Sequence, residues 1–125
     1  MQLWIGTQVP GLAGKAAANA IGMNEAMVTV HPMMIGGSFG RRFEVEIAAQ
    51  VAVLADRLKR PVQLIWSRAE DMRQDRFRPA AAARMTGKVG PAGQIEGWLA
   101  KIAVPATQAE LKSRIAARSS FYSDR

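Results

Sequence analysis

Cysteine is absent from this chain of 125 residues, and histidine occurs once, at His31. Without cysteine, these residues can form no disulfide, no thiolate zinc site and no cysteine-ligated iron–sulfur cluster. A cage of histidines around a metal is excluded in the same way. Because no ligand partners for His31 can be identified, we interpret it as a structural residue. The sequence therefore predicts no metal ligands of its own.

Long apolar runs and aromatic residues are also scarce. The chain has no run of about 18 apolar residues, so no segment is predicted to span a membrane. No leader of basic, apolar and small residues opens the chain, so no export signal is visible. The single tyrosine and the scattered tryptophans and phenylalanines form no stacking set for single-stranded nucleic acid. These features leave the cellular compartment open.

Positive charge is in excess, because 17 Lys and Arg against 10 Asp and Glu give a formal net charge of +7. Such an excess suits the binding of phosphate or nucleic acid. However, acidic residues such as Asp56, Glu70 and Asp75 are interleaved with the basic clusters at 57–60 and 68–84. We therefore favour a solvated or domain-contacting surface, and we predict no nucleic-acid partner.

Hydrophobic periodicity and turn residues divide the chain into helices and strands. The expected elements are strands at 3–5, 28–31, 62–66, 80–89 and 95–104, helices at 12–21, 44–59 and 107–118, and a short helical turn after Ser67. The last two strands form a hairpin, with a bulge at Gly97. The order β-α-β-α-β-β-β plus a C-terminal helix predicts an α+β fold with two main helices packed on one face of a mixed β-sheet. A boundary near Pro105 divides the chain into 1–105 and a C-terminal helix and tail at 106–125.

The helix expected at 44–59 is the most apolar element. Its polar side chains form only a narrow stripe at Glu46, Gln50 and Arg57. A helix with so little polar surface is expected to be nearly surrounded by protein.

The segment Ile35-Gly36-Gly37-Ser38-Phe39-Gly40-Arg41-Arg42 is the candidate binding loop. Glycine adopts positive φ without steric cost and lets a ligand approach the main chain, so such a loop can direct several N–H groups at one anionic ligand. The loop has neither the Gly-Lys-Ser/Thr ending of a Walker loop nor a GxGxxG pattern. From the residues alone, the alternative that these glycines only form a tight turn stays open.

Three stretches in register carry a family resemblance: Gly6-Thr7-Gln8, the loop Gly36–Arg42, and Arg60-Pro61-Val62-Gln63-Leu64-Ile65-Trp66-Ser67-Arg68-Ala69-Glu70-Asp71-Met72. Together they resemble the molybdopterin-binding region of the large subunit of molybdenum hydroxylases, the family of xanthine dehydrogenase and aldehyde oxidase. The variants with Gly-Arg-Arg and Trp-Ser-Arg are most similar to the beta subunits of isoquinoline 1-oxidoreductases. The resemblance covers about residues 2–104 and implies that the chain is part of a much larger polypeptide.

The resemblance implies a set of cofactor-binding residues: Gln8, Gly36, Gly37, Ser38, Phe39, Gly40 and Arg41. In the family, a glutamine at the position of Gln8 donates a hydrogen bond to an oxygen ligand of the molybdenum, and an aromatic residue at the position of Phe39 shapes the pocket. A neutral amide can donate without adding charge beside the metal. From the residues alone, Gln8 could instead cap a loop, and Glu44 or Glu46 could simply hold Arg41 or Arg42 in place.

The sequence departs from the purine-oxidising members of the family at the end of the loop. Arg41 and Arg42 stand where those members have glycine and lysine, and Ser38 stands where glycine is frequent. Phe43 stands where those members carry a glutamate that orients the substrate. Because an aromatic ring cannot accept a hydrogen bond from a purine as a carboxylate does, the resemblance implies an aldehyde or an aromatic N-heterocycle as substrate rather than xanthine.

For the complete enzyme, the resemblance implies hydroxylation with oxygen from water, a molybdenum–molybdopterin cofactor in its cytosine dinucleotide form, and electron transfer to an iron–sulfur subunit or domain. The base is a glutamate in a motif far downstream in the family. Since Glu44, Glu46, Glu70 and Glu96 match no such motif, we assign no catalytic residue here. The isolated fragment is expected to be inactive and to hold no cofactor.

Two other functions stay open from the residues alone. One is a freestanding basic α+β module that binds nucleic acid or a phosphorylated ligand through Arg41, Arg42 and the cluster at 57–60. The other is a structural packing domain whose glycine loop meets no ligand.

Overall fold

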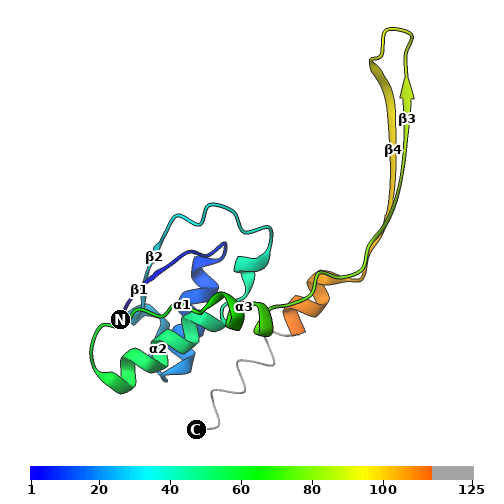
Figure 1. The fold of residues 1–125 in the computed structure, drawn as a ribbon. Helices are drawn as coiled ribbons and strands as arrows, with labels where there is room; N and C mark the ends of the chain where they lie inside the picture. Colours follow the sequence, from blue (N-terminus) through cyan, green and yellow to red (C-terminus); the bar gives the residue numbers. More distant parts are fainter. Residues whose placement is uncertain (114–125) are drawn as a thin grey trace. The chain divides into compact units, whose positions relative to one another are not determined.

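The computed structural model describes residues 1–113, which divide into two compact units, residues 1–67 (unit 1) and 68–113 (unit 2). Figure 1 shows the order of the elements along the chain. Unit 1 contains β1 (Gln2–Ile5), α1 (Pro10–Ala20), the 3-10 turn η1 (Glu25–Met27), β2 (Thr29–Pro32), the 3-10 turn η2 (Arg41–Phe43) and α2 (Glu46–Leu58). Unit 2 contains α3 (Arg68–Gln74), β3 (Ala82–Val89), β4 (Ile95–Ala103) and a helix that begins at Thr107. The predicted α+β class and the order of the elements are confirmed, apart from the strand expected at 62–66.

In unit 1, β1 and β2 form a parallel pair connected through α1, which is the arrangement of a β-α-β unit. The register places Leu3 opposite Val30 and Ile5 opposite Pro32. Pro10 opens α1, where its missing N–H costs no helical hydrogen bond. None of the helices within residues 1–113 is long and apolar enough to cross a membrane.

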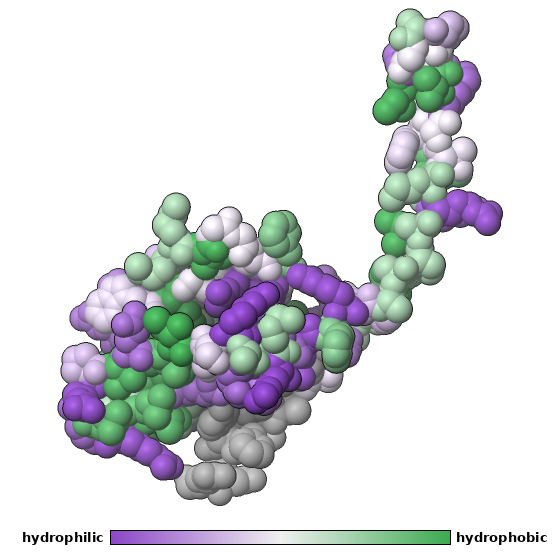
Figure 2. All heavy atoms as spheres, in the orientation of Figure 1, coloured by the Kyte–Doolittle hydropathy of each residue, from purple (hydrophilic) through white to green (hydrophobic). Residues whose placement is uncertain are grey.

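The core of unit 1 is built mainly from alanine. Leu3 is buried together with Ala13 and Ala17 of α1 and Ala48 and Ala52 of α2. On each helix, these alanines are four residues apart, so they share one face, and their small side chains let the two helices approach closely. Alanine fills the interface between α1 and α2, and many larger apolar side chains remain on the surface (Figure 2).

Two expectations for unit 1 differ from the structure. Only Ala48, Ala49 and Ala52 of α2 are buried, and Leu58 is half exposed, so α2 is covered on one face rather than surrounded. The segment 62–66 forms no strand pairing within residues 1–113, so the strands lie in two small sheets instead of one mixed sheet. A strand needs a hydrogen-bonding neighbour, and no backbone hydrogen bond joins 62–66 to β1 or to any other part of residues 1–113.

Unit 2 contains the predicted antiparallel hairpin of β3 and β4. Its turn is closed by the Gly90 N–H, which donates to the Gln94 carbonyl at 2.8 Å. The register shifts between Lys88 and Val89, where Lys88 pairs with Gly97 and Val89 pairs with Ile95. The bulge therefore lies at Glu96, one residue from the predicted Gly97. The predicted end of the last helix, at Arg118, lies outside the described residues.

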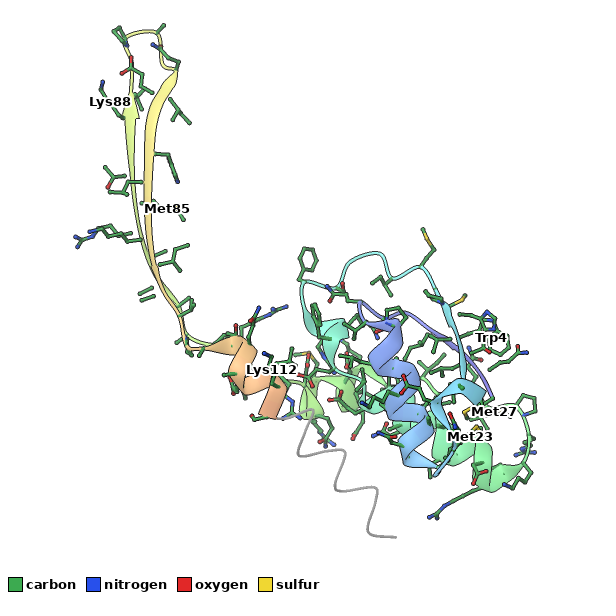
Figure 3. The ribbon with its side chains drawn as sticks, turned by 180° about the vertical axis from the view of Figure 1, so that it is seen from behind. Trp4, Met23, Met27, Met85, Lys88 and Lys112 are labelled. Carbon is green, nitrogen blue, oxygen red and sulfur yellow. The ribbon has the colours of Figure 1, made fainter. Side chains whose placement is uncertain are left out.

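The hairpin has one apolar face and one polar face, because opposed residues point to the same side of the sheet. The apolar face carries Ala83, Met85, Gly87 and Val89 with Ile95, Trp98, Ala100 and Ile102. On the other face, Arg84 lies directly opposite Lys101, and neither forms an ion pair within residues 1–113. Lys88, by contrast, pairs with Glu96 at 2.8 Å. Figure 3 labels Met85 and Lys88, which belong to the two different faces.

The alanine interface predicts a large effect of added volume. Replacing Ala17 by leucine should lower the free energy of unfolding of unit 1 by about 1–3 kcal/mol, because a larger side chain cannot fit between α1 and α2 without displacing them. Urea denaturation followed by circular dichroism measures the change. Asn19→Leu, at an exposed position of the same helix, is the control and should leave stability within about 0.5 kcal/mol. Equal effects of the two substitutions would contradict the packing described above.

The opposed cations of the hairpin give a second prediction. Lys101→Glu should convert a repulsive pair with Arg84 into an attractive one and slow amide hydrogen exchange in β3 by up to about fivefold. Lys88→Glu is the matched control, because it destroys the pair with Glu96 and should accelerate exchange. Faster exchange in Lys101→Glu would show that the two cations do not interact.

Candidate functional site

The candidate site lies where β1 and β2 end. Gly6-Thr7-Gln8 follows the last residue of β1, and the segment 33–40 follows the last residue of β2. Because the strands are parallel, their carboxyl ends meet at one edge of the sheet, which is where ligands bind in open α/β sheets. This topology brings Gln8 and the glycine loop together, although 32 residues separate Gln8 from Gly40.

Gln8 is hydrogen-bonded to the loop through its side chain and its backbone. Its Oε1 atom accepts from the Gly40 N–H at 3.1 Å, and its own N–H donates to the Arg42 carbonyl at 3.2 Å. An N–H group can only donate, so the carbonyl end of the Gln8 amide must be the end that faces Gly40. The Nε2 group is thereby left to donate to another acceptor.

Thr7 is a contributor that sequence reasoning did not single out. Its Oγ1 donates to the Arg42 carbonyl at 3.1 Å and accepts from the Val9 N–H at 3.1 Å. The Arg42 carbonyl therefore receives two donors, one from Thr7 and one from Gln8. A hydroxyl residue directly before Gln8 is the only signal in the sequence that could have indicated this role.

Gly6 sets how closely the loop approaches β1. A Cβ atom at this position would overlap the Ile35 side chain, at the start of the loop. Any larger residue would therefore push the loop away from the end of β1. This shift would also disrupt the hydrogen bond between Gly40 and Gln8.

The loop itself needs its glycines at two positions. Gly36 and Gly40 have φ of 67° and 85°, in the left-handed region that residues with side chains avoid. A Cβ atom at Gly36 would meet no other atom within 4 Å, so the space beside this backbone is open. The N–H groups of Gly36 and Ser38 donate no hydrogen bond within the part of the chain that the structure describes. Two donors and an open approach to the backbone are thus available in the loop that Gln8 contacts at Gly40.

Phe39 is held in an unfavourable conformation. Its φ is 47°, which costs about 1–2 kcal/mol for a residue with a Cβ atom. Its side chain is 85% exposed, and its ring lies against Gly37, where an added Cβ would be 3.0 Å from the ring. An exposed ring contributes little burial to offset that cost, so the strain points to a function other than stability.

The electrostatic environment favours a negatively charged ligand. The helix α1 begins two residues after Gln8, has no acidic residue in its first turn, and its N-cap Val9 makes no side-chain bond to it. The positive end of its dipole therefore lies next to the site, together with the first N–H groups of the helix, which have no helical partner. Arg41 and Arg42, the last two residues of the loop, lie within η2.

Comparison with known proteins identifies the family. The sequence model of the family described as "Molybdopterin cofactor-binding domain" matches residues 1–118. The chain belongs to this family. The resemblance found in the three sequence stretches is confirmed, and the chain is homologous to subunits of molybdenum hydroxylases, which are oxidoreductases.

Two curated relatives illustrate the similarity. The isoquinoline 1-oxidoreductase subunit beta of Brevundimonas diminuta is 34% identical over 88 residues, which cover 70% of this chain and 11% of that protein. The membrane-bound aldehyde dehydrogenase [pyrroloquinoline-quinone] of Gluconacetobacter polyoxogenes is 29% identical over 85 residues, which cover 67% of this chain and 11% of that protein. The matched part is thus about one ninth of the length of these relatives. No solved structure matches the chain.

The strain at Phe39 gives a testable prediction. Phe39→Gly should leave the free energy of unfolding unchanged or raise it by up to about 1 kcal/mol, because glycine adopts positive φ without cost while an exposed ring loses little burial. Gly40→Ala, at a φ of 85°, is the control and should lower stability by about 1 kcal/mol or more. Urea unfolding measures both. A loss above about 1 kcal/mol in Phe39→Gly would mean that the ring is retained for stability.

Proposed function

We propose that Gln8, Gly36, Gly37, Ser38, Phe39, Gly40 and Arg41 bind the molybdenum cofactor in a molybdenum hydroxylase subunit. The observation that supports this most is the hydrogen bond from the Gly40 N–H to Gln8 Oε1 at 3.1 Å. It joins the glutamine and the glycine loop, which the family resemblance pairs, and it leaves the amide of Gln8 able to donate.

The residues present fit such a cofactor in three respects. The open space beside Gly36 admits a ligand to the backbone, and the N–H groups of Gly36 and Ser38, which have no partner within residues 1–113, can donate to it. The Nε2 group of Gln8 can donate to an oxygen atom without adding charge. The N-terminus of α1 together with Arg41 favours the phosphate carried by a pterin cofactor. The Phe39 ring would cover one side of the bound group.

When bound, the molybdenum cofactor supplies the two-electron redox chemistry, and the protein supplies binding and orientation. Hydrogen bonds to the Gly40 N–H and the Arg42 carbonyl hold Gln8 in place, and the Thr7 hydroxyl donates to the same carbonyl of Arg42. Each of these contacts restricts the position of the amide Nε2 relative to the loop. The role of this part of the chain is therefore positioning, and the residue that acts as base belongs elsewhere in the subunit.

We infer that the complete enzyme oxidises an aldehyde or an aromatic N-heterocycle with oxygen from water. The names of the two relatives contain an N-heterocycle and an aldehyde, respectively. Phe43, which follows directly after the Arg42 carbonyl bonded by Gln8, is half-buried and offers an apolar ring where the purine-oxidising enzymes have a carboxylate. An apolar substrate is compatible with this position.

The proposal extends to partners and to the form of the cofactor. The rest of the same subunit completes the pocket, an iron–sulfur subunit or domain accepts the electrons, and the pterin is the cytosine dinucleotide form. Because the chain spans about 11% of the relatives it matches, residues 1–125 by themselves are expected to be inactive.

Variants of Gln8 in the full-length polypeptide test the assignment. Gln8→Glu retains an acceptor for the Gly40 N–H but loses the donor and adds negative charge, so turnover should fall by about 10- to 100-fold while stability is kept. Gln8→Met loses donor and acceptor, so stability should also fall by about 1 kcal/mol. Turnover, molybdenum content by mass spectrometry, and urea unfolding are measured on the same preparations.

Two outcomes would contradict the proposal. Unchanged turnover and molybdenum content in both variants would show that Gln8 does not contact the cofactor. If the purified enzyme contained pyrroloquinoline quinone and no molybdenum, the assignment of a molybdenum cofactor would be wrong. The cofactor would then be the one in the name of the second relative.

A further inference from the structure

A groove of about 850 Å³ lies within unit 1, away from the glycine loop. It is lined by the residues of β1 on one side and by the segment 61–65 on the other, and α2 contributes Ile47, Val51 and Ala55. Apart from Met33, which directly follows β2, its lining residues come from 1–5, α2 and 61–65, so most of the groove lies on the side of β1 that faces away from β2. Figure 2 shows hydrophobic side chains together in this part of unit 1, where Figure 1 places the N-terminus, β1 and α2.

The edge of β1 beside the groove has no partner within residues 1–113. The Met1 carbonyl accepts from the Thr29 N–H at 2.9 Å, and the Ile5 carbonyl accepts from the Met33 N–H at 3.0 Å. Consecutive residues of a strand direct their N–H and C=O groups to opposite edges. The odd-numbered residues of β1 therefore bond to β2, and the backbone groups of Gln2 and Trp4 point to the other edge.

The opposite wall of the groove has the pattern of a strand without a neighbour. Exposure alternates along 62–66, with Val62, Leu64 and Trp66 half-buried and the intervening side chains exposed. The Nε1 of Trp66 donates to Gln50 Oε1 of α2 at 3.1 Å, which ties this segment to the helix. No backbone hydrogen bond involves residues 61–66 anywhere in the described part of the chain. The period of two predicted a strand here, and the side chains follow that prediction while the backbone remains unpaired.

We propose that the groove is a vacant strand position, which is filled by one β-strand of about four or five residues from the rest of a molybdenum hydroxylase subunit. Two strands that flank a third lie about 10 Å apart, since neighbouring strands are about 4.8 Å apart. A strand between β1 and 62–66 would satisfy the backbone groups of both walls and join them into one sheet, as in β-strand addition. The origin of the strand rests on the proposed function, because the relatives contain about nine times as much chain as the part matched here.

Other occupants do not satisfy the same groups. A helix already pairs its own N–H and C=O groups, so it would leave both walls unpaired. An apolar small molecule would cover Ile47 and Val51 but could not bond to the backbone of Gln2 and Trp4. Only another extended backbone presents donors and acceptors along the whole length of both walls.

The walls also determine the chemistry of the strand. On the side of α2, its residues would face Ile47, Val51 and Ala55. On the other side, the neighbouring side chains are Trp4, which is 60% exposed and labelled in Figure 3, and Ile65, which is 77% exposed. Apolar neighbours on both faces call for a continuous run of Val, Ile or Leu, as in strands that are buried on both sides.

Residue-resolved amide hydrogen exchange in the full-length polypeptide tests the proposal. The amides of Leu3 and Ile5 serve as the internal reference, since their edge of β1 faces β2. If the strand is present, the Trp4 amide and every second amide of 62–66, those that point into the groove, should exchange within about tenfold of this reference. Exchange of these amides at the rate of an unstructured peptide, with Leu3 and Ile5 still protected, would overturn the proposal.

Photo-crosslinking identifies the occupant. A photoreactive amino acid replaces the exposed Gln63 in the groove, and the same replacement of the exposed Asn19 in α1 is the control. The expected crosslink from position 63 joins a segment of the same polypeptide outside residues 1–125. Crosslinks only to residues 1–5, which would mean direct pairing of 62–66 with β1, or only to a second copy would overturn it.

Molybdenum content measured on the same samples separates this proposal from the proposed function. Protection at Trp4 in a protein without molybdenum would support the strand and contradict the cofactor assignment. A molybdenum-loaded protein without such protection would contradict the strand alone.

Discussion

The parallel pairing of β1 with β2 is the constraint on which the site depends. Two parallel strands must end at the same edge, so whatever follows each strand is brought to one place. Here a hydroxyl and an amide follow β1, a glycine loop follows β2, and α1 starts from the same edge. The hydrogen bonds of Thr7 and Gln8 to Arg42 and Gly40 are local consequences of this arrangement. A slip in the register of the two strands would separate them.

The elements that depend on local pattern could be predicted from the sequence. The high helix propensity of alanine predicted α1, and alternation with β-branched residues predicted β2. Two alternating runs around Gly90-Pro91-Ala92-Gly93 predicted the hairpin. The meeting of Gln8 with the loop could also be anticipated, because the family resemblance links the two stretches and both follow predicted strands. The helix, strand and hairpin predictions succeed because their information lies within a few residues, whereas the contact of Gln8 with the loop spans 32 residues and followed from the resemblance.

The failures concern long-range partners. The segment 62–66 has the side-chain period of a strand, but pairing needs a neighbour, and no pattern within five residues can show whether one exists. The exposed flank of α2 has the same cause, since an apolar face indicates that something covers it without indicating what. Thr7 was overlooked for a different reason. Its role depends on the carbonyl of Arg42, which is 35 residues away and has no side-chain signature.

The alanine core of unit 1 has a thermal consequence. Alanine removes little apolar surface from water, and none of the large side chains within residues 1–113 is fully buried. The heat capacity of unfolding rises mainly with the apolar surface that becomes exposed, so it should be small for this unit. A small heat-capacity change flattens the curve of stability against temperature. Unit 1 is therefore expected to lose little of its stability in the cold.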